Sequence, residues 1–301
     1  MREPACSAHA VGYNLPPDSH RRAGRTRLCM RGASRMNITL LGTGNALVTE
    51  CYNTCFVVSD GNRRFLVDGG GGNTVLVQLK RAGIDWRDIR EIFVTHKHID
   101  HIVGIVWLVR LICQNMAKGT YEGDATIYGH AEVLNIVRSI ATMLLQPKQT
   151  RFIDDRLHLI TVEDGETCTI IGKQVTFFDI QSTKAKQFGF TMDLGEGEKL
   201  TCCGDEPYNM CEQPYAQGST WLLHEAFCLH GQADIFSPYE KHHSTVKDAC
   251  ELAEQLGVPN LVLYHTEDRN IARRKELYAA EGAQYYHGNL YIPDDLEVIE
   301  L

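Results

Sequence analysis

The distribution of apolar and polar residues predicts a chain in which short strands alternate with helices. Short aliphatic runs bounded by glycine or polar turns are typical of strands, and they occur at 37–41, 55–59, 64–67, 92–94, 125–128, 157–162, 174–179, 200–204, 221–223 and 261–264. Longer segments with apolar residues at helical spacing predict helices at 74–82, 102–114, 132–145 and 246–256. Hairpins are expected for 55–59 with 64–67 and for 157–162 with 174–179. Together these elements predict two mixed β-sheets covered by helices.

Composition favours one folded domain over residues 36–301. The 301 residues are 44% apolar, enough for a substantial core, and contain no repeat, low-complexity tract or linker. No apolar run approaches ~18 residues and no signal-like segment is found, so we expect neither a membrane span nor a secretory signal, and a cytoplasmic location. The net charge of -8 argues against a surface that binds nucleic acid throughout, but not against a local basic groove.

Residues 1–35 differ from the rest of the chain. They carry seven arginines and no lysine against Glu3 and Asp18, with little periodic apolar pattern. This composition predicts a disordered N-terminal extension. An RNA-binding arm is the alternative that the arginines leave open.

The eleven cysteines contain no Cys-x-x-Cys pair, which favours buried reduced thiols. Cys202 and Cys203 are adjacent, so on a strand they point to opposite faces and are expected to fill the core rather than bind a metal.

The segment Thr95–His101 concentrates potential metal ligands directly after a strand. It contains three imidazoles and one carboxylate within six residues. Residues two apart on an extended chain face the same way, so His96 and His98 can hold one ion together. Asp100 and His101 fall where the chain turns into the next element, and can face a second ion. Single histidines are commonly surface or core residues, but four ligand-type residues in this order predict a metal site.

Three later strands each end on a ligand-type residue. Asp205 follows 200–204, Glu225 follows His224 after 221–223, and His265 follows 261–264. Loops at strand ends are where rigid sheets present chemistry, so these residues are expected to converge. Asp68, which ends the strand at 64–67, is expected to brace the metal loop through hydrogen bonds.

The motif Thr-His-x-His-x-Asp-His at 95–101 resembles the signature of the metallo-β-lactamase superfamily. Gly204-Asp205, His224-Glu225-Ala226-Phe227 and Lys241-His242-His243-Ser244-Thr245 resemble elements of its ribonuclease Z-like branch. The resemblance runs from about Met36 to Leu301. It implies an α+β fold, an αββα four-layer sandwich of two mixed β-sheets flanked by helices.

The resemblance also implies residue roles. His96 and His98 hold one divalent ion, Asp100, His101 and His265 hold the other, and Asp205 bridges the two; zinc or manganese is expected. Asp100 can also orient the attacking water. His243, held by Glu225, protonates the leaving oxygen. In the same element Thr245-x-x-Asp248 is a capping box, so Ser244 and Thr245 are expected to be structural.

The implied activity is that of a metal-dependent phosphodiesterase or endoribonuclease that uses a metal-bound hydroxide. The implied partners are a phosphodiester or RNA substrate and a second copy in a homodimer. An ester, thioester or lactone hydrolase of the same fold is the alternative within hydrolases. From a different class, a catalytically inert metal-binding sensor or scaffold is the alternative.

The chain departs from the ribonuclease Z pattern at two positions near the metal ligands. The histidine expected before Gly189-Phe190 is absent, because 181–188 reads Gln-Ser-Thr-Lys-Ala-Lys-Gln-Phe. The first ion then has only His96, His98 and Asp205, unless Gln181 or water completes the set. At the second position, Glu206 replaces the usual hydroxyl residue.

The spacing of these segments bears on the substrate. Gln181 and Asp205 are only 24 positions apart, which leaves no room for the protruding arm that binds tRNA in ribonuclease Z. Processing of tRNA is therefore less favoured than the motifs alone suggest.

Overall fold

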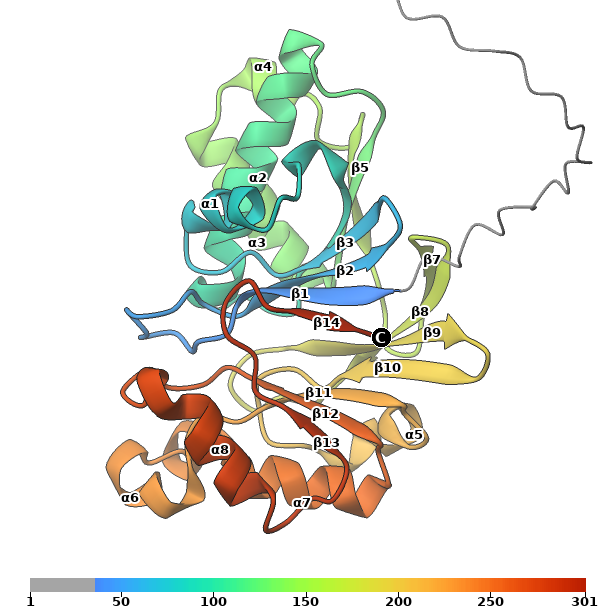
Figure 1. The fold of residues 1–301 in the computed structure, drawn as a ribbon. Helices are drawn as coiled ribbons and strands as arrows, with labels where there is room; N and C mark the ends of the chain where they lie inside the picture. The colour runs from blue at the N-terminus through green and yellow to red at the C-terminus, as the bar shows by residue number, and fades with distance from the viewer. Residues whose placement is uncertain (1–35) are drawn as a thin grey trace, which may run out of the picture. The chain divides into compact units, whose positions relative to one another are not determined.

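Residues 36–301 are described by a computed structural model, and the extension predicted at 1–35 lies outside the described residues. The described chain forms two seven-stranded β-sheets that face each other, with helices on both outer sides (Figure 1). The predicted αββα sandwich is confirmed.

The first sheet contains the N-terminal half of the described chain and the last strand. Its order is β14-β1-β2-β3-β4-β5-β6. The bounds are β1 Asn37–Gly42, β2 Cys55–Asp60, β3 Arg63–Val67, β4 Ile89–Phe93, β5 Ala125–Gly129, β6 Leu157–Thr161 and β14 Val298–Glu300. Strands β14 to β3 pair antiparallel, whereas β3 to β6 run parallel. The predicted hairpin of β2 and β3 is confirmed.

The second sheet has the order β13-β12-β11-β10-β9-β8-β7. Its strands are β7 Thr167–Ile170, β8 Lys173–Asp179, β9 Phe188–Gly195, β10 Glu198–Cys202, β11 Trp221–Glu225, β12 Asn260–Tyr264 and β13 Asn289–Tyr291. Strands β7 to β10 form an antiparallel meander, and β10 to β13 run parallel. Both sheets therefore present the carboxyl ends of several parallel strands along one edge.

One expected hairpin is wrong. The segments predicted at 157–162 and 174–179 become β6 and β8, which belong to different sheets. The hairpin partner of β8 is β7, a four-residue strand that lies between them in the sequence. Both segments have strand character, but that character does not say which of two facing sheets a strand joins. The chain crosses from one sheet to the other at this point.

Helices cover the outer faces of both sheets (Figure 1). Helices α1, α2 and α3 pack on the first sheet, and α7 and α8 on the second. Their bounds are α1 Thr74–Arg81, α2 Ile99–Lys118, α3 Ala131–Leu144, α7 Val246–Leu256 and α8 Arg274–Gly282. The shorter helices are α4 Pro147–Thr150, α5 Gln213–Ala216 and α6 Ala233–Phe236; single 3-10 turns are η1 Trp86–Asp88, η2 Met210–Glu212, η3 His230–Gln232, η4 Tyr239–Lys241 and η5 Ile271–Arg273.

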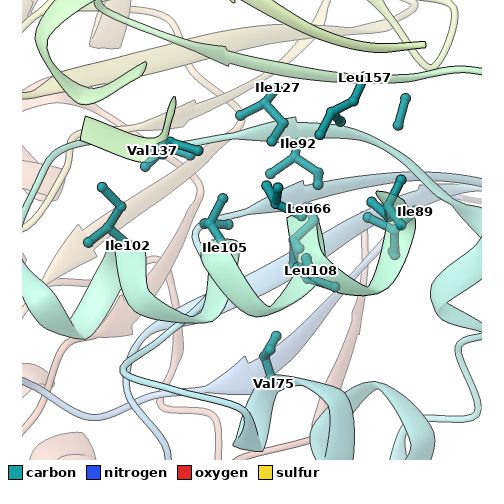
Figure 2. Packing of buried hydrophobic residues seen from close by; sticks show 14 of the residues in the cluster. Leu66, Val75, Ile89, Ile92, Ile102, Ile105, Leu108, Ile127, Val137 and Leu157 are labelled. Carbon is teal, nitrogen blue, oxygen red and sulfur yellow. The ribbon is translucent and has the colours of Figure 1, made fainter. Parts of the chain in front are cut away.

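The core is divided into layers by strand alternation. In β2, Cys55 and Val57 face the helices, while Phe56 and Val58 face the second sheet, as the two-residue period of a strand requires. Figure 2 shows the helix-side layer, where Ile105 and other residues of α2 pack onto the first sheet. Adjacent Cys202 and Cys203 divide in the same way between the inter-sheet layer and the helix layer.

Helix α2 extends the predicted helix at both ends. By length and composition alone it could cross a membrane, yet most of it is buried inside the fold, which is the packing of a core helix. Its N-terminal extension places Asp100 and His101 in the first helical turn. The helix ends at Gly119, whose φ of 70° is the left-handed conformation that glycine adopts readily.

Candidate metal centre

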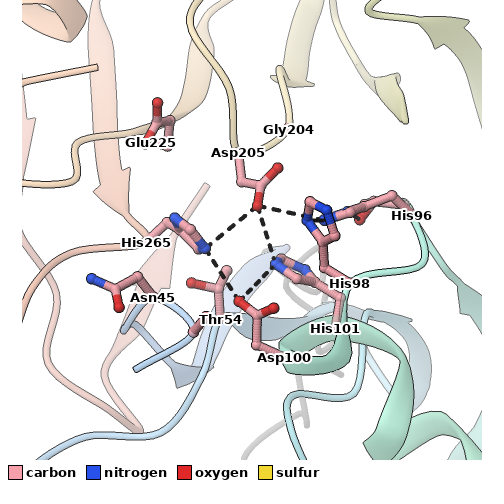
Figure 3. Close-up of polar contacts among 12 residues, drawn as sticks. Asn45, Thr54, His96, His98, Asp100, His101, Gly204, Asp205, Glu225 and His265 are labelled. Atoms are coloured by element: carbon pink, nitrogen blue, oxygen red, sulfur yellow. Dashed lines mark hydrogen bonds and ion pairs between the residues drawn. The ribbon is translucent and has the colours of Figure 1, made fainter. Parts of the chain in front are cut away.

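The predicted ligands converge at the edge where parallel strands of both sheets end. Val67 and Phe93 end β3 and β4 in the first sheet, and β10, β11 and β12 end side by side in the second. The residues that follow these strands therefore meet in one place. Six residues gather there (Figure 3): His96, His98, Asp100, His101, Asp205 and His265. Sequence analysis named all six.

The first group consists of His96, His98 and Asp205, each of which offers one ligand atom within 4.8 Å of the others. Nε2 of His96 lies 2.8 Å from Nδ1 of His98 and 3.5 Å from Oδ2 of Asp205. His96 and His98 are two positions apart in the extended loop before α2 and reach the same point, as predicted.

The second group consists of Asp100, His101 and His265, also within 4.8 Å of one another. Oδ2 of Asp100 lies 3.4 Å from Nε2 of His101 and 3.4 Å from Nε2 of His265. All three residues are buried. The first turn of α2 supplies two of them, and the residue after β12 supplies the third.

Asp205 lies between the two groups. Its Oδ2 is 3.5 Å from Nε2 of His96, and 3.4 Å from Nε2 of both His101 and His265 (Figure 3). One carboxylate oxygen thus faces imidazoles of both groups, which is the place of a bridging ligand. The preceding Gly204 has a φ of 81°, and this left-handed turn directs the aspartate into the site.

Asp68 braces the loop in the way predicted. Its Oδ1 accepts a hydrogen bond from the backbone N–H of Thr95 at 2.9 Å, and its Oδ2 accepts one from the Thr95 hydroxyl at 2.8 Å. Nδ1 of His101 lies 2.7 Å from Oδ2 of the same carboxylate. Because a carboxylate accepts, Nδ1 of His101 carries a proton, and Nε2 is the nitrogen that a metal can take after its own proton leaves.

His96 is oriented by the same network. The Thr95 hydroxyl donates to Asp68, so it accepts from Nδ1 of His96, which lies 2.9 Å away. Nε2 of His96 is then unprotonated and faces His98 and Asp205. Two imidazoles therefore turn Nε2 towards one point, and Asp68 fixes the orientation of both rings through their Nδ1 atoms.

The charges at the centre suit a cation. Burial lowers the pKa of His96 well below its usual value, so this imidazole is neutral and able to bind a metal. Burial alone would raise the pKa values of Asp205 and Asp100, but the neighbouring imidazoles hold both below the normal range. Nε2 of His101 and Oδ1 of Asp205 are buried without a hydrogen-bond partner. Buried imidazole nitrogens and carboxylate oxygens without hydrogen-bond partners are ligand atoms that fit a divalent ion.

The predicted acid pair, Glu225 and His243, adjoins the second group. Oε2 of Glu225 lies 3.1 Å from Nδ1 of His243, and its Oε1 accepts the backbone N–H of Ser244. The ring of Phe227 stacks on His243 with centroids 4.8 Å apart and planes at 5°. On its other side, the His243 ring centroid lies 5.1 Å from that of His265. A carboxylate, an aromatic ring and the backbone thus orient this imidazole.

Burial acts on both members of this pair. It raises the pKa of Glu225 well above its normal value and lowers that of His243 to about 4. The neighbouring His224, by contrast, turns away from the centre, and its Nδ1 lies 2.8 Å from the carbonyl oxygen of Glu225. His224 joins none of the metal-ligand groups among the described residues.

Thr245 has the structural role predicted, while Ser244 contributes its backbone N–H to Glu225 and its carbonyl oxygen to the N–H of Phe227. The Thr245 hydroxyl accepts from the N–H of Asp248, and the Asp248 carboxylate accepts the N–H of Thr245 at 2.8 Å. This capping box begins α7 at Val246.

Gln181 does not complete the first group. Its side chain is exposed, its φ is 55°, and its backbone N–H donates to the Asp179 carboxylate at 2.8 Å. Within residues 36–301, the first group therefore has three ligands of the His, Cys, Asp and Glu types.

Sequence analysis did not identify Arg274, which supports the loop of His265. This arginine is fully buried at the start of α8 and donates to the hydroxyl groups of Thr266 at 2.7 Å and Thr43 at 3.1 Å. It also donates to the carbonyl oxygen of Pro293 at 2.8 Å. The turn at Thr43 in turn accepts the backbone N–H of Thr266. An arginine in a polar helical segment gives no sequence signal of such burial.

Comparisons with known proteins agree with this architecture. The family described as "Anti-Pycsar protein Apyc1" matches residues 36–282. A ribonuclease Z of Synechococcus sp. strain CC9605 is 24% identical over 287 residues, which cover 78% of this chain and 88% of that protein. The predicted relation to ribonuclease Z is confirmed.

Solved structures show the same fold. The metallo-β-lactamase fold protein YhfI from Bacillus subtilis aligns with a TM-score of 0.71 at 17% identity, covering 89% of this chain and 100% of that one. The short form of human tRNase Z aligns with a TM-score of 0.65 at 20% identity, covering 88% and 98%. The predicted metallo-β-lactamase fold is confirmed.

Proposed function

Because the chain belongs to the family described as Anti-Pycsar protein Apyc1, and because its buried histidines and aspartates form a metal-ligand centre, we propose that it is a metal-dependent phosphodiesterase. Its proposed substrates are small phosphodiesters, with 3′,5′-cyclic nucleotides as the class. Relatives and solved structures support the coarser part of this proposal, a hydrolase of the metallo-β-lactamase fold. The substrate class is supported by the proton donor at His243 and by the short connection between β9 and β10.

The observation that carries the proposal is the position of Asp205 between two imidazole groups. A single oxygen within 3.5 Å of nitrogens from His96, His101 and His265 is suited to hold two ions close together. Ions held there, zinc or manganese by ligand type, would supply Lewis acidity and lower the pKa of a water molecule. Such a pair suits in-line attack on a phosphodiester.

The protein's own groups would complete the reaction. Asp100 orients the attacking water, since its carboxylate lies at the centre of the second group. His243 is mostly neutral near pH 7 in the substrate-free protein, since burial lowers its pKa to about 4; beside an anionic phosphate it would take up a proton and deliver it to the leaving oxygen. Glu225 together with the stacked ring of Phe227 holds its ring in position. An alkoxide leaving group, as in a cyclic nucleotide, needs that proton.

The loops near the centre favour a small substrate. The cavity of about 370 Å³ beside His243 is lined by Tyr208, Tyr239 and Asp248 among others, but by none of the six residues of the centre, so its volume does not measure the substrate site. The described residues contain no long arm between β8 and β10. Strands β9 and β10 are joined by the tight turn at Glu196 and Gly197, so residues 181–205 contain no protruding arm of the kind with which ribonuclease Z holds tRNA.

The test is hydrolysis of a defined substrate panel by metal-loaded protein. The panel contains 3′,5′-cyclic nucleotides, a tRNA precursor with a 3′ trailer, and the neutral ester p-nitrophenyl acetate. The proposal predicts that cyclic nucleotides give the highest kcat/KM and yield mononucleotides. Preferential cleavage of the tRNA precursor would overturn the substrate class, and preferential cleavage of the ester would overturn the phosphodiesterase assignment.

A further inference from the structure

The loop that lacks the expected histidine lies directly beside the first group. It joins β8 to β9 and is closed by a hydrogen bond from Ile180 N–H to the Gln187 carbonyl at 3.1 Å. The N–H of Phe188 then donates to the carbonyl oxygen of Thr95 at 3.1 Å, which ties the loop to the residue before His96. Side chains on this loop are therefore close to the His96–His98 pair.

The two departures from the ribonuclease Z pattern contact each other. Ser182, in the loop without the histidine, donates its hydroxyl to Oε1 of Glu206 at 2.6 Å. The same hydroxyl accepts the backbone N–H groups of Lys184 and Ala185 at 3.2 Å. Glu206 is buried next to Asp205. The glutamate that replaces a hydroxyl residue thus anchors the loop that replaces a histidine.

Lys184 lies on this anchored loop and reaches the segment that leads to His243. Its Nζ donates to the carbonyl oxygen of Lys241 at 2.9 Å and lies 3.9 Å from Oε1 of Glu206. Lys241 is two residues before His243, so the ammonium group lies beside the acid pair. The Lys184 side chain is 25% exposed, which places it at the rim rather than in the core.

The ammonium charge acts on several groups of the centre. After burial, it contributes to the lowered pKa values of His98 and His243, and it opposes the raised pKa of Glu225. These effects agree with the geometry, which places the ammonium group one hydrogen bond from the segment that leads to His243. An ammonium group has three donors, and among the described residues only the Lys241 carbonyl accepts one. Donors remain for an anionic ligand at the rim.

We propose that Lys184 binds a non-bridging oxygen of the substrate phosphate, on the side of the first group. Ser182 and Glu206 hold the loop so that the ammonium group stays there. The inference rests on the proposed function. In this proposal, the loop that lacks the expected histidine supplies no fourth metal ligand. It supplies a lysine ammonium group that contacts the phosphate directly, as lysine does in other phosphate sites.

The test compares Lys184→Gln with Lys184→Arg in the metal-loaded full chain. Lys186→Gln is the matched control, because Lys186 lies on the same loop but is 44% exposed and faces Asp179 at 3.8 Å. Two quantities are measured: the affinity for inorganic phosphate by calorimetry, and kcat/KM for a 3′,5′-cyclic nucleotide and for p-nitrophenyl acetate. Metal content and circular dichroism establish that each variant is folded and loaded.

Lys184→Gln is expected to weaken phosphate binding about tenfold and to lower kcat/KM for the cyclic nucleotide by roughly 10–100-fold. In Lys184→Gln, hydrolysis of the neutral ester should change less than about twofold. Lys184→Arg should restore most of the phosphate affinity. Lys186→Gln should resemble the parent in both measurements. Unchanged phosphate affinity in Lys184→Gln overturns the inference. If Lys184→Gln and Lys184→Arg both lose kcat/KM equally on the cyclic nucleotide and on the ester, Lys184 has a structural role and the inference is overturned.

The two proposals can fail separately. If the protein cleaves no phosphodiester but only Lys184→Gln loses phosphate affinity, the proposed function fails while the anion site at Lys184 stands. If phosphodiesters are cleaved and Lys184→Gln behaves like the parent in both measurements, the function stands and the role of Lys184 fails.

Discussion

Oδ2 of Asp68 lies 2.7 Å from Nδ1 of His101, and the same carboxylate accepts both the backbone N–H and the hydroxyl of Thr95. One buried side chain therefore orients the second group directly and the first group through Thr95 and His96. Asp68 belongs to neither of the two metal-ligand groups, yet it decides which imidazole nitrogen of each ring faces the centre.

Replacing Asp68 by asparagine should weaken metal binding without removing a ligand. An amide that presents its NH2 group to Nδ1 of His101 would disfavour the required tautomer. We expect metal affinity to fall by about 10–100-fold, measured by competition with a chromophoric chelator. Asp60→Asn, at the half-buried end of β2 far along the sequence from the ligands, is the control and should bind metal like the parent. An unchanged affinity in Asp68→Asn would show that the hydrogen bond to His101 has no part in ligand orientation.

The acid pair should matter only when the leaving group needs a proton. For a 3′,5′-cyclic nucleotide, His243→Gln should lower kcat by roughly 10²–10⁴-fold, and Glu225→Gln should have a smaller effect in the same direction. For bis(p-nitrophenyl) phosphate, whose leaving group is weakly basic, both variants should stay within about tenfold of the parent. Steady-state kinetics at constant metal content measure both effects. Equal losses on the two substrates would contradict proton delivery by His243.

The two groups should differ in how metal affinity depends on pH. Burial lowers the pKa values of His96 and His98, so their neutral forms persist below 6.5. Although burial opposes it, the carboxylates of Asp100 and Asp68 raise the pKa of His101 well above 6.5, so a metal there must displace a proton. A His101→Gln variant, which keeps the first group, should therefore lose less affinity than a variant that keeps the second group as the pH falls from about 6.5 to 5.5.

The complementary variant is His98→Gln, which keeps the second group. Its metal affinity should fall about tenfold for each unit by which the pH is lowered from about 6.5 to 5.5, because one proton must leave His101 for each ion bound. Calorimetric titration with Zn²⁺ at each pH measures both slopes. Similar slopes in the two variants would mean that the protonation states assigned to His96 and His101 are wrong.

Arg274 should contribute strongly to stability. It is fully buried and donates to Thr43, Thr266 and Pro293, so Arg274→Ala leaves buried oxygens without donors and opens a cavity. The free energy of unfolding should fall by about 2–4 kcal/mol, measured by urea denaturation. Arg273→Ala is the control, since Arg273 is 63% exposed and pairs with Glu276; its change should stay within about 0.5 kcal/mol. A loss in Arg274→Ala as small as in this control would contradict the role assigned to the buried guanidinium.

Local pattern was enough to mark the residues of the centre as candidates because they lie at the end of an apolar strand or in the loop and helical turn that follow it. His96 follows β4 and His265 follows β12, and parallel neighbours bring strand ends to one edge whatever the detailed packing. The helix of Val246 was predicted with its bounds because Thr245 and Asp248 signal its start within four residues. Signals of this kind depend only on neighbouring residues, so they do not require knowledge of the tertiary fold.

Other features depend on contacts between distant segments. The sequence pattern of β6 and β8 could not show that they join different sheets, because both are short strands of partly apolar character. Nor could it place Lys184, whose partners Glu206 and Lys241 are 22 and 57 positions away. From the sequence alone, a lysine in a polar loop is expected to be solvated. Its position at the centre follows only from the fold.

The most direct test of the account is a metal titration of the metal-free protein with Zn²⁺ or Mn²⁺ while the hydrolysis of a 3′,5′-cyclic nucleotide is followed. The account predicts that the rate is negligible in chelator, rises with added metal and saturates near two ions per chain. Asp205→Asn, which alters the carboxylate between the two groups, should not reach that rate at any metal concentration. Full activity in the presence of chelator, or no hydrolysis with both ions bound, would contradict the account.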